Sequence, residues 1–149
     1  MNPLQPSVGR EQLKRLPSIV TDRRALAVRY AELLADISAL GLPIEPAWAR
    51  SNWQSYAVRL PRAVNQQGLM QTLLDDRIST RRGIMCSHRE PAYRDQPCAR
   101  ALVHSEHAQD RSVLLPLFCG LTFADQRQVV AALREACSAR REMLPLQAT

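Results

Sequence analysis

The sequence predicts an α+β protein in which a small, mostly antiparallel sheet is covered by helices. Over its 149 residues, segments with apolar side chains at helical spacing alternate with short segments of period two. The chain contains neither an internal repeat nor a low-complexity tract, so one layered domain accounts for the pattern. We therefore expect a single domain over residues 1–149, with a lead segment at 1–17 and the folded unit at 18–149.

The first long element is an amphipathic helix predicted from about Ser18 to Leu40. Its apolar residues recur at spacings of three and four and form one stripe: Leu26, Tyr30, Leu33, Ile37 and Leu40. Gly41 is expected to end the helix in a left-handed conformation, and Pro43 to prevent its continuation. Pro17 is expected to separate this helix from the lead segment.

A strand and a second helix follow. The segment Asn52–Leu60 alternates polar and apolar positions and contains two aromatic residues, which predicts a strand ended by Pro61. A helix is then predicted over about Asn65–Asp76. Its inward-facing residues are expected to be Leu69, Met70, Leu73 and Leu74.

Two further strands are predicted, at Ile84–Ser87 and at Val113–Leu117. Pro116 cannot donate to a sheet ladder, so the second of these is expected at an edge. A polar loop is predicted between them, from about Arg89 to Ser105.

The last helix is predicted to begin at Thr122. Its hydroxyl can cap the first turn, and Asp125, three residues later, supports the same turn. The buried stripe of this helix is expected to comprise Val129, Val130, Leu133, Ala136 and Cys137.

The net charge of +6 does not indicate nucleic-acid binding. Nineteen of the twenty basic residues are arginine, and they are spread along the chain among acidic residues rather than clustered. No apolar run is long enough for a membrane helix, and the N-terminal residues lack the apolar core of a signal peptide. We therefore expect a cytoplasmic protein, with no nucleic-acid or membrane partner and with free cysteine thiols.

The stretch ISTRRGIMCSHREPAY, residues 78–93, concentrates reactive side chains and raises two chemical alternatives. A zinc site has five candidate ligands nearby, but their spacing is irregular: Cys86, His88, Cys98, His104 and His107. Cys86 could also act as a nucleophile beside His88 and Arg82. Solvated histidines and an inert thiol are the commoner outcomes, so we assign no metal site and no catalytic residue.

Five segments, in this order along the chain, resemble the C-terminal small domain of the DegT/DnrJ/EryC1/StrS family of pyridoxal-phosphate-dependent sugar-nucleotide aminotransferases. They are RRALAVRYAELL, SNWQSYAVRL, ISTRRGIMCSH, HSEHAQDRSVLLPLF and LTFADQRQVVAALREAC. The resemblance covers about Gln12 to Cys137. No single segment is highly specific, but five in the family's order make the resemblance strong.

The resemblance implies that the family's large domain, which carries the Schiff-base lysine and most of the cofactor site, is absent here. Lys14 is the sole lysine and matches no cofactor-binding motif, so no covalent pyridoxal phosphate is expected on this chain. Alone, the chain is expected to be inactive as a transaminase. Its expected partner is an aminotransferase large domain, an intact homologue or a second copy. The alternative function is a non-catalytic interaction or regulatory module of the same fold.

By the same resemblance, residues 78–93 form one wall of a cleft for a nucleotide-sugar substrate. Arg81 or Arg82 is expected to bind its phosphate or carboxylate oxygens, because a guanidinium binds such groups in a bidentate way. The other predicted substrate contacts are Asn52, Gln54, Tyr56 and His88. Ion pairs from these arginines to Asp75 or Asp76 are the structural alternative.

One position departs from the family pattern. The family usually has glycine before the isoleucine of this turn, whereas this chain has Arg77. A left-handed arginine costs on the order of 1 kcal/mol, so either Arg77 bears that strain or the helix ends differently.

Overall fold

The computed structural model describes residues 4–93 and 101–138. Their helices and strands follow one another along the chain in this order: α1 (Leu4–Leu34), β1 (Tyr56–Arg59), α2 (Gln66–Asp75), β2 (Arg81–Arg82), the 3-10 helix η1 (Ser87–Arg89), α3 (Val103–Arg111), β3 (Ser112–Leu115) and α4 (Phe123–Ser138). Within these residues, no helix is long and apolar enough to cross a membrane.

The three strands form one antiparallel sheet in the order β1-β3-β2, which confirms the predicted α+β class. Tyr56 pairs with Leu115 and Arg81 pairs with Leu114. The prediction that the third strand lies at an edge was wrong, since β3 is central. Pro116 follows the last residue of β3 and therefore removes no hydrogen bond from the ladder.

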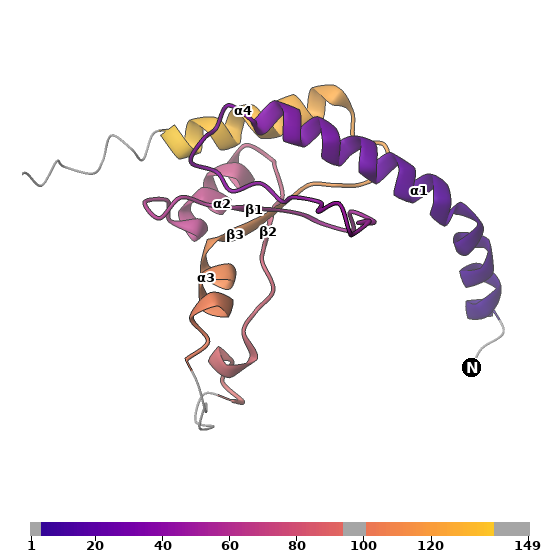
Figure 1. Ribbon diagram of the computed structural model, residues 1–149, viewed down its shortest axis with the longest axis horizontal. Coiled ribbons are helices and arrows are strands. Elements are labelled where there is room, and N and C mark those ends of the chain that lie inside the picture. The colour runs from indigo at the N-terminus through magenta and orange to yellow at the C-terminus, as the bar shows by residue number, and fades with distance from the viewer. Residues whose placement is uncertain (1–3, 94–100, 139–149) are drawn as a thin grey trace, which may run out of the picture.

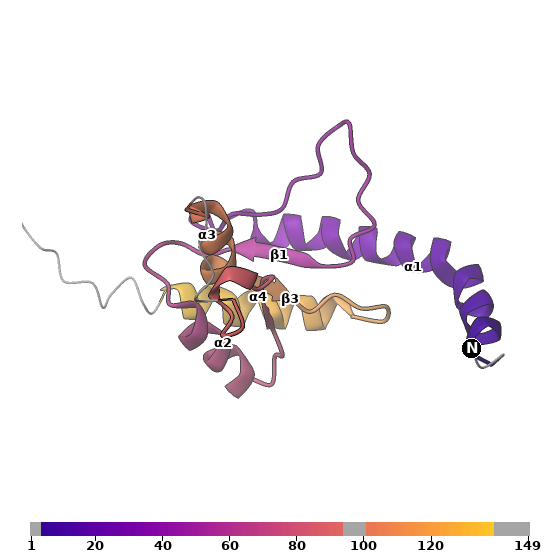
Figure 2. The same cartoon turned by 90° about the horizontal axis from the view of Figure 1, so that it is seen from below.

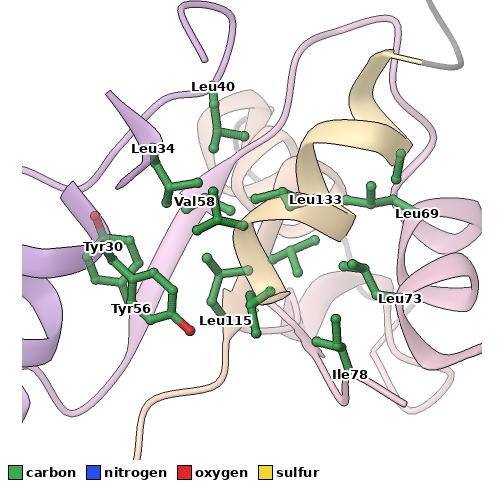
Figure 3. Close-up of a cluster of buried hydrophobic side chains, with 14 of the residues drawn as sticks. Tyr30, Leu34, Leu40, Tyr56, Val58, Leu69, Leu73, Ile78, Leu115 and Leu133 are labelled. Carbon is green, nitrogen blue, oxygen red and sulfur yellow. The ribbon is translucent and has the colours of Figure 1, made fainter. Parts of the chain in front are cut away.

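Three helices cover one face of this sheet. Figure 1 shows α1 and α4 side by side above the strands, and α4 also contacts α2. Strand β1 turns Tyr56 and Val58 into the core and leaves Ala57 and Arg59 exposed, as its period-two pattern predicts. Figure 3 shows the resulting core, which includes Tyr30, Leu34, Tyr56, Val58, Leu69, Leu73, Ile78, Leu115 and Leu133.

Helix α1 is longer at its N-terminus than predicted. Pro17 lies inside it rather than before it, so the prediction that Pro17 separates this helix from the preceding residues was wrong. Proline has no backbone N–H, so the helix lacks one hydrogen-bond donor at this position. One turn later, Thr21 Oγ1 donates to the carbonyl oxygen of Pro17 at 3.0 Å. Figures 1 and 2 show the N-terminal half of α1 curving away past the sheet.

The end of α1 also differs from the prediction. The helix stops at Leu34, and two tight turns follow, in which Ile37 donates to Leu34 and Leu40 donates to Ile37. These turns keep the apolar spacing of three residues without a helix, which is why the sequence pattern continues to Leu40. Gly41 forms no left-handed cap; it pairs with Arg59 through two backbone hydrogen bonds of 2.8 Å.

The region after β2 is the largest departure from the sequence prediction. The strand expected at Ile84–Ser87 is absent, because the paired residues are Arg81–Arg82, and Ile84 is 91% exposed. The loop expected over Arg89–Ser105 contains the start of α3, a polar helix with no apolar stripe to indicate it, while residues 94–100 lie outside the described part. Together, residues 83–93 and 101–111 form an arm that extends from one end of the sheet (Figure 1).

The start of α4 agrees with the prediction. Thr122 Oγ1 accepts from the backbone N–H of Asp125 at 3.1 Å, and Asp125 Oδ2 accepts from the N–H of Thr122 at 2.9 Å. The cap also includes a hydrogen bond from the Thr122 hydroxyl to Asp125 Oδ2 at 2.6 Å, which, ahead of the bond from the Thr122 N–H, lowers the pKa of Asp125. It fixes the first turn of the helix that covers the sheet.

Candidate functional site

The turn that leads into β2 keeps the left-handed residue expected from the resemblance. Arg77 has φ +63°, its N–H donates to Leu74 O at 2.9 Å, and the N–H of Ile78 donates to Leu73 O at 2.8 Å. This is the Schellman pattern of a helix end, and Ile78 and Leu73 are both buried, as the pattern favours. Arg77 therefore bears the strain that glycine would avoid.

Arg81 and Arg82 point to opposite faces of the sheet. Arg81 pairs with Leu114 and shares with it the face that carries Ala57, whereas Arg82 pairs with the buried Val113. Both arginines are exposed. Neither forms an ion pair with Asp75, Asp76 or any other residue in the described part of the chain. Of the two, Arg81 is the one directed at the sheet face that the helices leave open.

Asn52 and Gln54 lie in the loop before β1, and both are exposed. The loop is held locally, since Asn52 Oδ1 accepts from the backbone N–H of Gln54 at 3.1 Å. Trp53 between them has φ +48°, and its indole N–H donates to Glu45 at 3.1 Å. The strained residue turns the two amide side chains outward while the indole packs against the core.

Tyr56 is fully buried rather than placed on an open cleft wall. Its ring packs between Trp53 and Tyr30, with ring centroids 5.7 and 5.1 Å away. Its hydroxyl has no hydrogen-bond partner among the described residues. Burial disfavours the phenolate and raises the pKa of Tyr56 to about 12. Thr80 Oγ1, just before β2, is likewise buried with no hydrogen-bond partner among the described residues.

His88 lies on the arm, where it is tied to α3. Its Nε2 lies 2.9 Å from Glu106 Oε1, and Arg89 contacts Glu106 at 3.3 Å and Asp110 at 2.6 Å. The hydrogen bond from His88, followed by the nearby charge of Arg89, lowers the pKa of Glu106. Glu106 and Asp110 were missed by the sequence analysis, although their spacing of four places both on one helix face.

The antiparallel order divides the predicted residues into two groups. The start of β1, the end of β3 and the start of β2 meet at one end of the sheet, so Tyr56 and Arg81 lie in adjacent rows. Asn52 and Gln54 precede β1 at that end. The arm with His88 leaves from the opposite end, where Gly83 donates to Ser112 O. Asn52, Gln54, Tyr56 and Arg81 thus lie near one another, and His88 lies apart from them.

The cysteine and histidine candidates do not come together. Cys86 is buried, and its backbone N–H donates to Gln109 at 2.6 Å. His104 and His107 are exposed on α3, and Cys98 lies outside the described residues. Within residues 4–93 and 101–138, no three metal-binding side chains are grouped.

Lys14 does not fit a cofactor site. It lies on the exposed N-terminal half of α1, where its Nζ is 2.7 Å from Glu11 and both side chains are 68% exposed. A Schiff-base lysine is held in an enclosed pocket with a phosphate cradle, and the residues beside Lys14 form only a shallow apolar hollow around Leu13 and Leu16. The surroundings of Lys14 therefore differ from those of a Schiff-base lysine.

Fold and site together define a small α+β domain with exposed arginine and amide groups at one end of its sheet. The model of the DegT/DnrJ/EryC1/StrS aminotransferase family matches residues 1–134, and the chain belongs to this family. Members of the family are pyridoxal-phosphate-dependent aminotransferases.

Solved structures agree with this assignment. The aminotransferase TlmJ from Streptoalloteichus hindustanus is 30% identical, with a TM-score of 0.79 over 89% of this chain and 36% of its own. DesV from S. venezuelae, solved with a ketimine intermediate, is 28% identical, with a TM-score of 0.77 over 87% of this chain and 35% of its own. DesI, solved with its TDP-sugar product, is 26% identical, with a TM-score of 0.76 over 87% and 34%. The chain therefore spans about a third of the length of these proteins.

Proposed function

We propose that this chain serves as the small domain of a sugar-nucleotide aminotransferase and forms one wall of its substrate cleft. In this proposal, a large domain supplies the lysine and the cofactor. This chain covers 34–36% of the length of the related structures, which supports a division into a small and a large domain. The substrate class follows from DesI, whose structure holds a TDP-sugar product.

The observation that carries the proposal is the exposed apolar side of the N-terminal half of α1. Val8, Leu13 and Leu16 are 61%, 66% and 49% exposed. This half of the helix extends beyond the sheet in both views (Figures 1 and 2). Apolar side chains gathered on one helix side mark a docking surface more often than free solvent. We assign this surface to the large domain.

The residues at the Tyr56 end of the sheet then have distinct roles. Arg81 binds phosphate oxygens of the nucleotide sugar, since its guanidinium is exposed on the open sheet face and free of described carboxylates. Asn52 and Gln54 donate and accept hydrogen bonds to the sugar. Arg82, at the sheet edge, and His88, on the arm, each contact either the substrate or the large domain. The Tyr56 hydroxyl gains a hydrogen-bond partner when the two domains assemble.

The test is reconstitution with a large domain encoded next to this chain. Co-expression should yield a complex that transaminates a nucleotide-linked keto-sugar, whereas the chain alone should not. In the complex, Arg81→Gln should raise KM for the sugar nucleotide at least ten-fold, while Arg62→Gln, an exposed arginine away from this end, should leave it unchanged. A complex that forms but has no activity with any nucleotide sugar would instead support the interaction-module alternative.

The apolar surface of α1 also predicts the behaviour of the isolated chain. Without a large domain, we expect self-association, which multi-angle light scattering would detect at high concentration. Leu13→Gln together with Leu16→Gln should reduce it, while Val28→Gln, on the part of α1 over the sheet, serves as a matched control. A monomer at every concentration contradicts the assigned docking surface. A cytoplasmic location belongs to the same proposal.

A further inference from the structure

A hollow of about 690 Å³ lies between the end of β1 and α3. Figure 2 shows α3 beside the tip of β1. Among the described residues, its lining includes no acidic side chain and four basic ones: Arg59, His104, His107 and Arg111. These residues lie in segments that resemble the family, but neither the resemblance nor the proposed cleft gives them a role. The volume lies within the range of about 300–1,000 Å³ typical of small-molecule sites.

The basic character of the hollow follows from the division of α3 into two faces. His104, His107 and Arg111 follow one another at steps of three and four and share one face. Glu106 and Asp110 lie on another side of the helix, roughly a third of a turn away, where His88 and Arg89 hold them. The acidic groups of α3 are therefore engaged on the arm side, and only basic groups face the tip of β1.

The basic side chains of the hollow have few partners of their own. Arg111 Nη2 donates to Leu60 O at 2.9 Å, and its Nε is buried with no partner among the described residues. Arg59, His104 and His107 form no ion pair or side-chain hydrogen bond within residues 4–93 and 101–138. Two guanidinium charges on one concave surface, with no carboxylate among its described lining residues, favour an anion between them.

The backbone fixes the position of these groups. Two hydrogen bonds of 2.8 Å join Gly41 to Arg59, and the N–H of Leu60 donates to Arg111 O at 2.7 Å. Gly41 also leaves room for the Arg59 side chain, because a Cβ at position 41 would lie 2.9 Å from Arg59 Nε. The backbone of both arginines is thus held before any ligand binds, and the Arg111 side chain is held as well by its bond to Leu60 O, which lowers the entropic cost of binding.

We propose that this hollow is an anion site for phosphate groups, of a size that accepts a diphosphate. Two guanidinium groups provide planar donors to phosphate oxygens, and the imidazoles add donors and, when protonated, charge. The site is formed by residues of this chain alone, so it does not depend on a large domain. It also lies at the end of β1 opposite to Asn52, Gln54 and Tyr56.

The test is isothermal titration of the purified chain with inorganic pyrophosphate at fixed ionic strength. We expect saturable binding of one pyrophosphate, weakened roughly ten-fold by Arg59→Gln. Arg62→Gln removes the same charge three residues away and should leave the affinity unchanged. Equal weakening by both variants, or no saturable binding to the unchanged chain, overturns the proposal.

Two further variants keep the test decisive if Arg59→Gln fails to fold. Gly41→Ala leaves the net charge unchanged but displaces the Arg59 guanidinium, and should weaken binding several-fold. Replacing His104 and His107 together by glutamine alters only exposed side chains and should also weaken binding. Unchanged affinity in both variants contradicts the site.

A nucleoside diphosphate distinguishes the source of the phosphate groups. Equal affinity for UDP and pyrophosphate assigns recognition to the phosphates alone, and tighter binding of UDP extends the site to the nucleoside. UDP binding that persists in Arg59→Gln overturns the assignment to this hollow.

Discussion

The rings of Tyr30 and Tyr56 pack with centroids 5.1 Å apart, yet their hydroxyls have different surroundings. The Tyr30 hydroxyl donates to Pro116 O at 3.0 Å, whereas the Tyr56 hydroxyl is buried with no partner among the described residues. A buried hydroxyl without a partner loses its bonds to water and gains none. The pair therefore combines one stabilising polar contact with one unfavourable group.

This difference predicts opposite effects for two identical substitutions. Tyr30→Phe should lower the free energy of unfolding by about 1 kcal/mol, because it also leaves a proline carbonyl unpaired. Tyr56→Phe should raise it by about 1 kcal/mol in the isolated chain, since the ring packing is kept. Urea unfolding measures both. If the two variants are destabilised alike, Tyr56 has a partner in solution, and its proposed role on assembly loses its basis.

The ion-pair network of the arm predicts a specific dependence of stability on pH. The lowered pKa of Glu106 means that its contribution is present above the carboxyl's unfolded pKa and is lost as pH falls through the lowered folded pKa. His88 and Arg89 face this carboxylate. Melting temperatures measured from pH 6 to pH 3 should therefore fall less steeply in Glu106→Gln than in the unchanged chain.

Glu32→Gln is the matched control for this measurement. Glu32 is exposed on α1 and makes no ion pair within the described residues, so its removal should leave the acid slope unchanged. Parallel slopes for Glu106→Gln and the unchanged chain would show that the arm contacts are not maintained in solution.

Lys14 supports a prediction about the cofactor. Because it is solvent-exposed and paired with Glu11, it should form no stable Schiff base. The chain mixed with pyridoxal phosphate should show no bound-cofactor absorbance, and borohydride reduction should leave no stoichiometric adduct by mass spectrometry. Lys14→Arg serves as the blank. A stoichiometric adduct that disappears in Lys14→Arg contradicts the division into a small domain and a cofactor-bearing large domain.

The sequence predicts the elements whose signals are local. The cap of α4 depends on Thr122 and Asp125, which lie within one turn, and the alternation of β1 places Tyr56 in the core. The prediction failed where contacts between residues far apart in the sequence determine the position of an element. Strand β3 is central because both neighbours pair with it, a property that Pro116 cannot indicate.

The arm and α1 show two other limits of the sequence analysis. Helix α3 is held by contacts from Glu106 and Asp110 to η1 rather than by an apolar stripe, so no period of 3.6 indicates it. In α1, Pro17 costs one backbone donor, but the surrounding helix continues through it. Of the candidate site, the substrate wall stays a prediction: Arg81 is exposed near Tyr56, whereas His88 lies apart because of strand pairing that the sequence does not specify.

Arg77 allows the turn before β2 to be tested directly. Its φ of +63° is unfavourable for a side chain with a Cβ and free of strain for glycine. Arg77→Gly should therefore raise the free energy of unfolding by roughly 1 kcal/mol, even though glycine adds entropy to the unfolded chain. Gly120→Ala is the inverse control. Gly120 has φ +94° and open space where a Cβ would stand, so this change should destabilise through backbone strain alone.

The sign of the Arg77→Gly effect reports on the proposed cleft, because the left-handed turn sets where β2 begins. Stabilisation by Arg77→Gly with destabilisation by Gly120→Ala, both measured by urea unfolding, supports the turn and the direction of Arg81 that follows from it. If Arg77→Gly is neutral or destabilising while Gly120→Ala behaves as expected, α2 ends in a right-handed turn in solution. The register of β2 then changes, and the assignments of Arg81, Arg82 and His88 to the substrate wall are withdrawn, while the α+β fold remains.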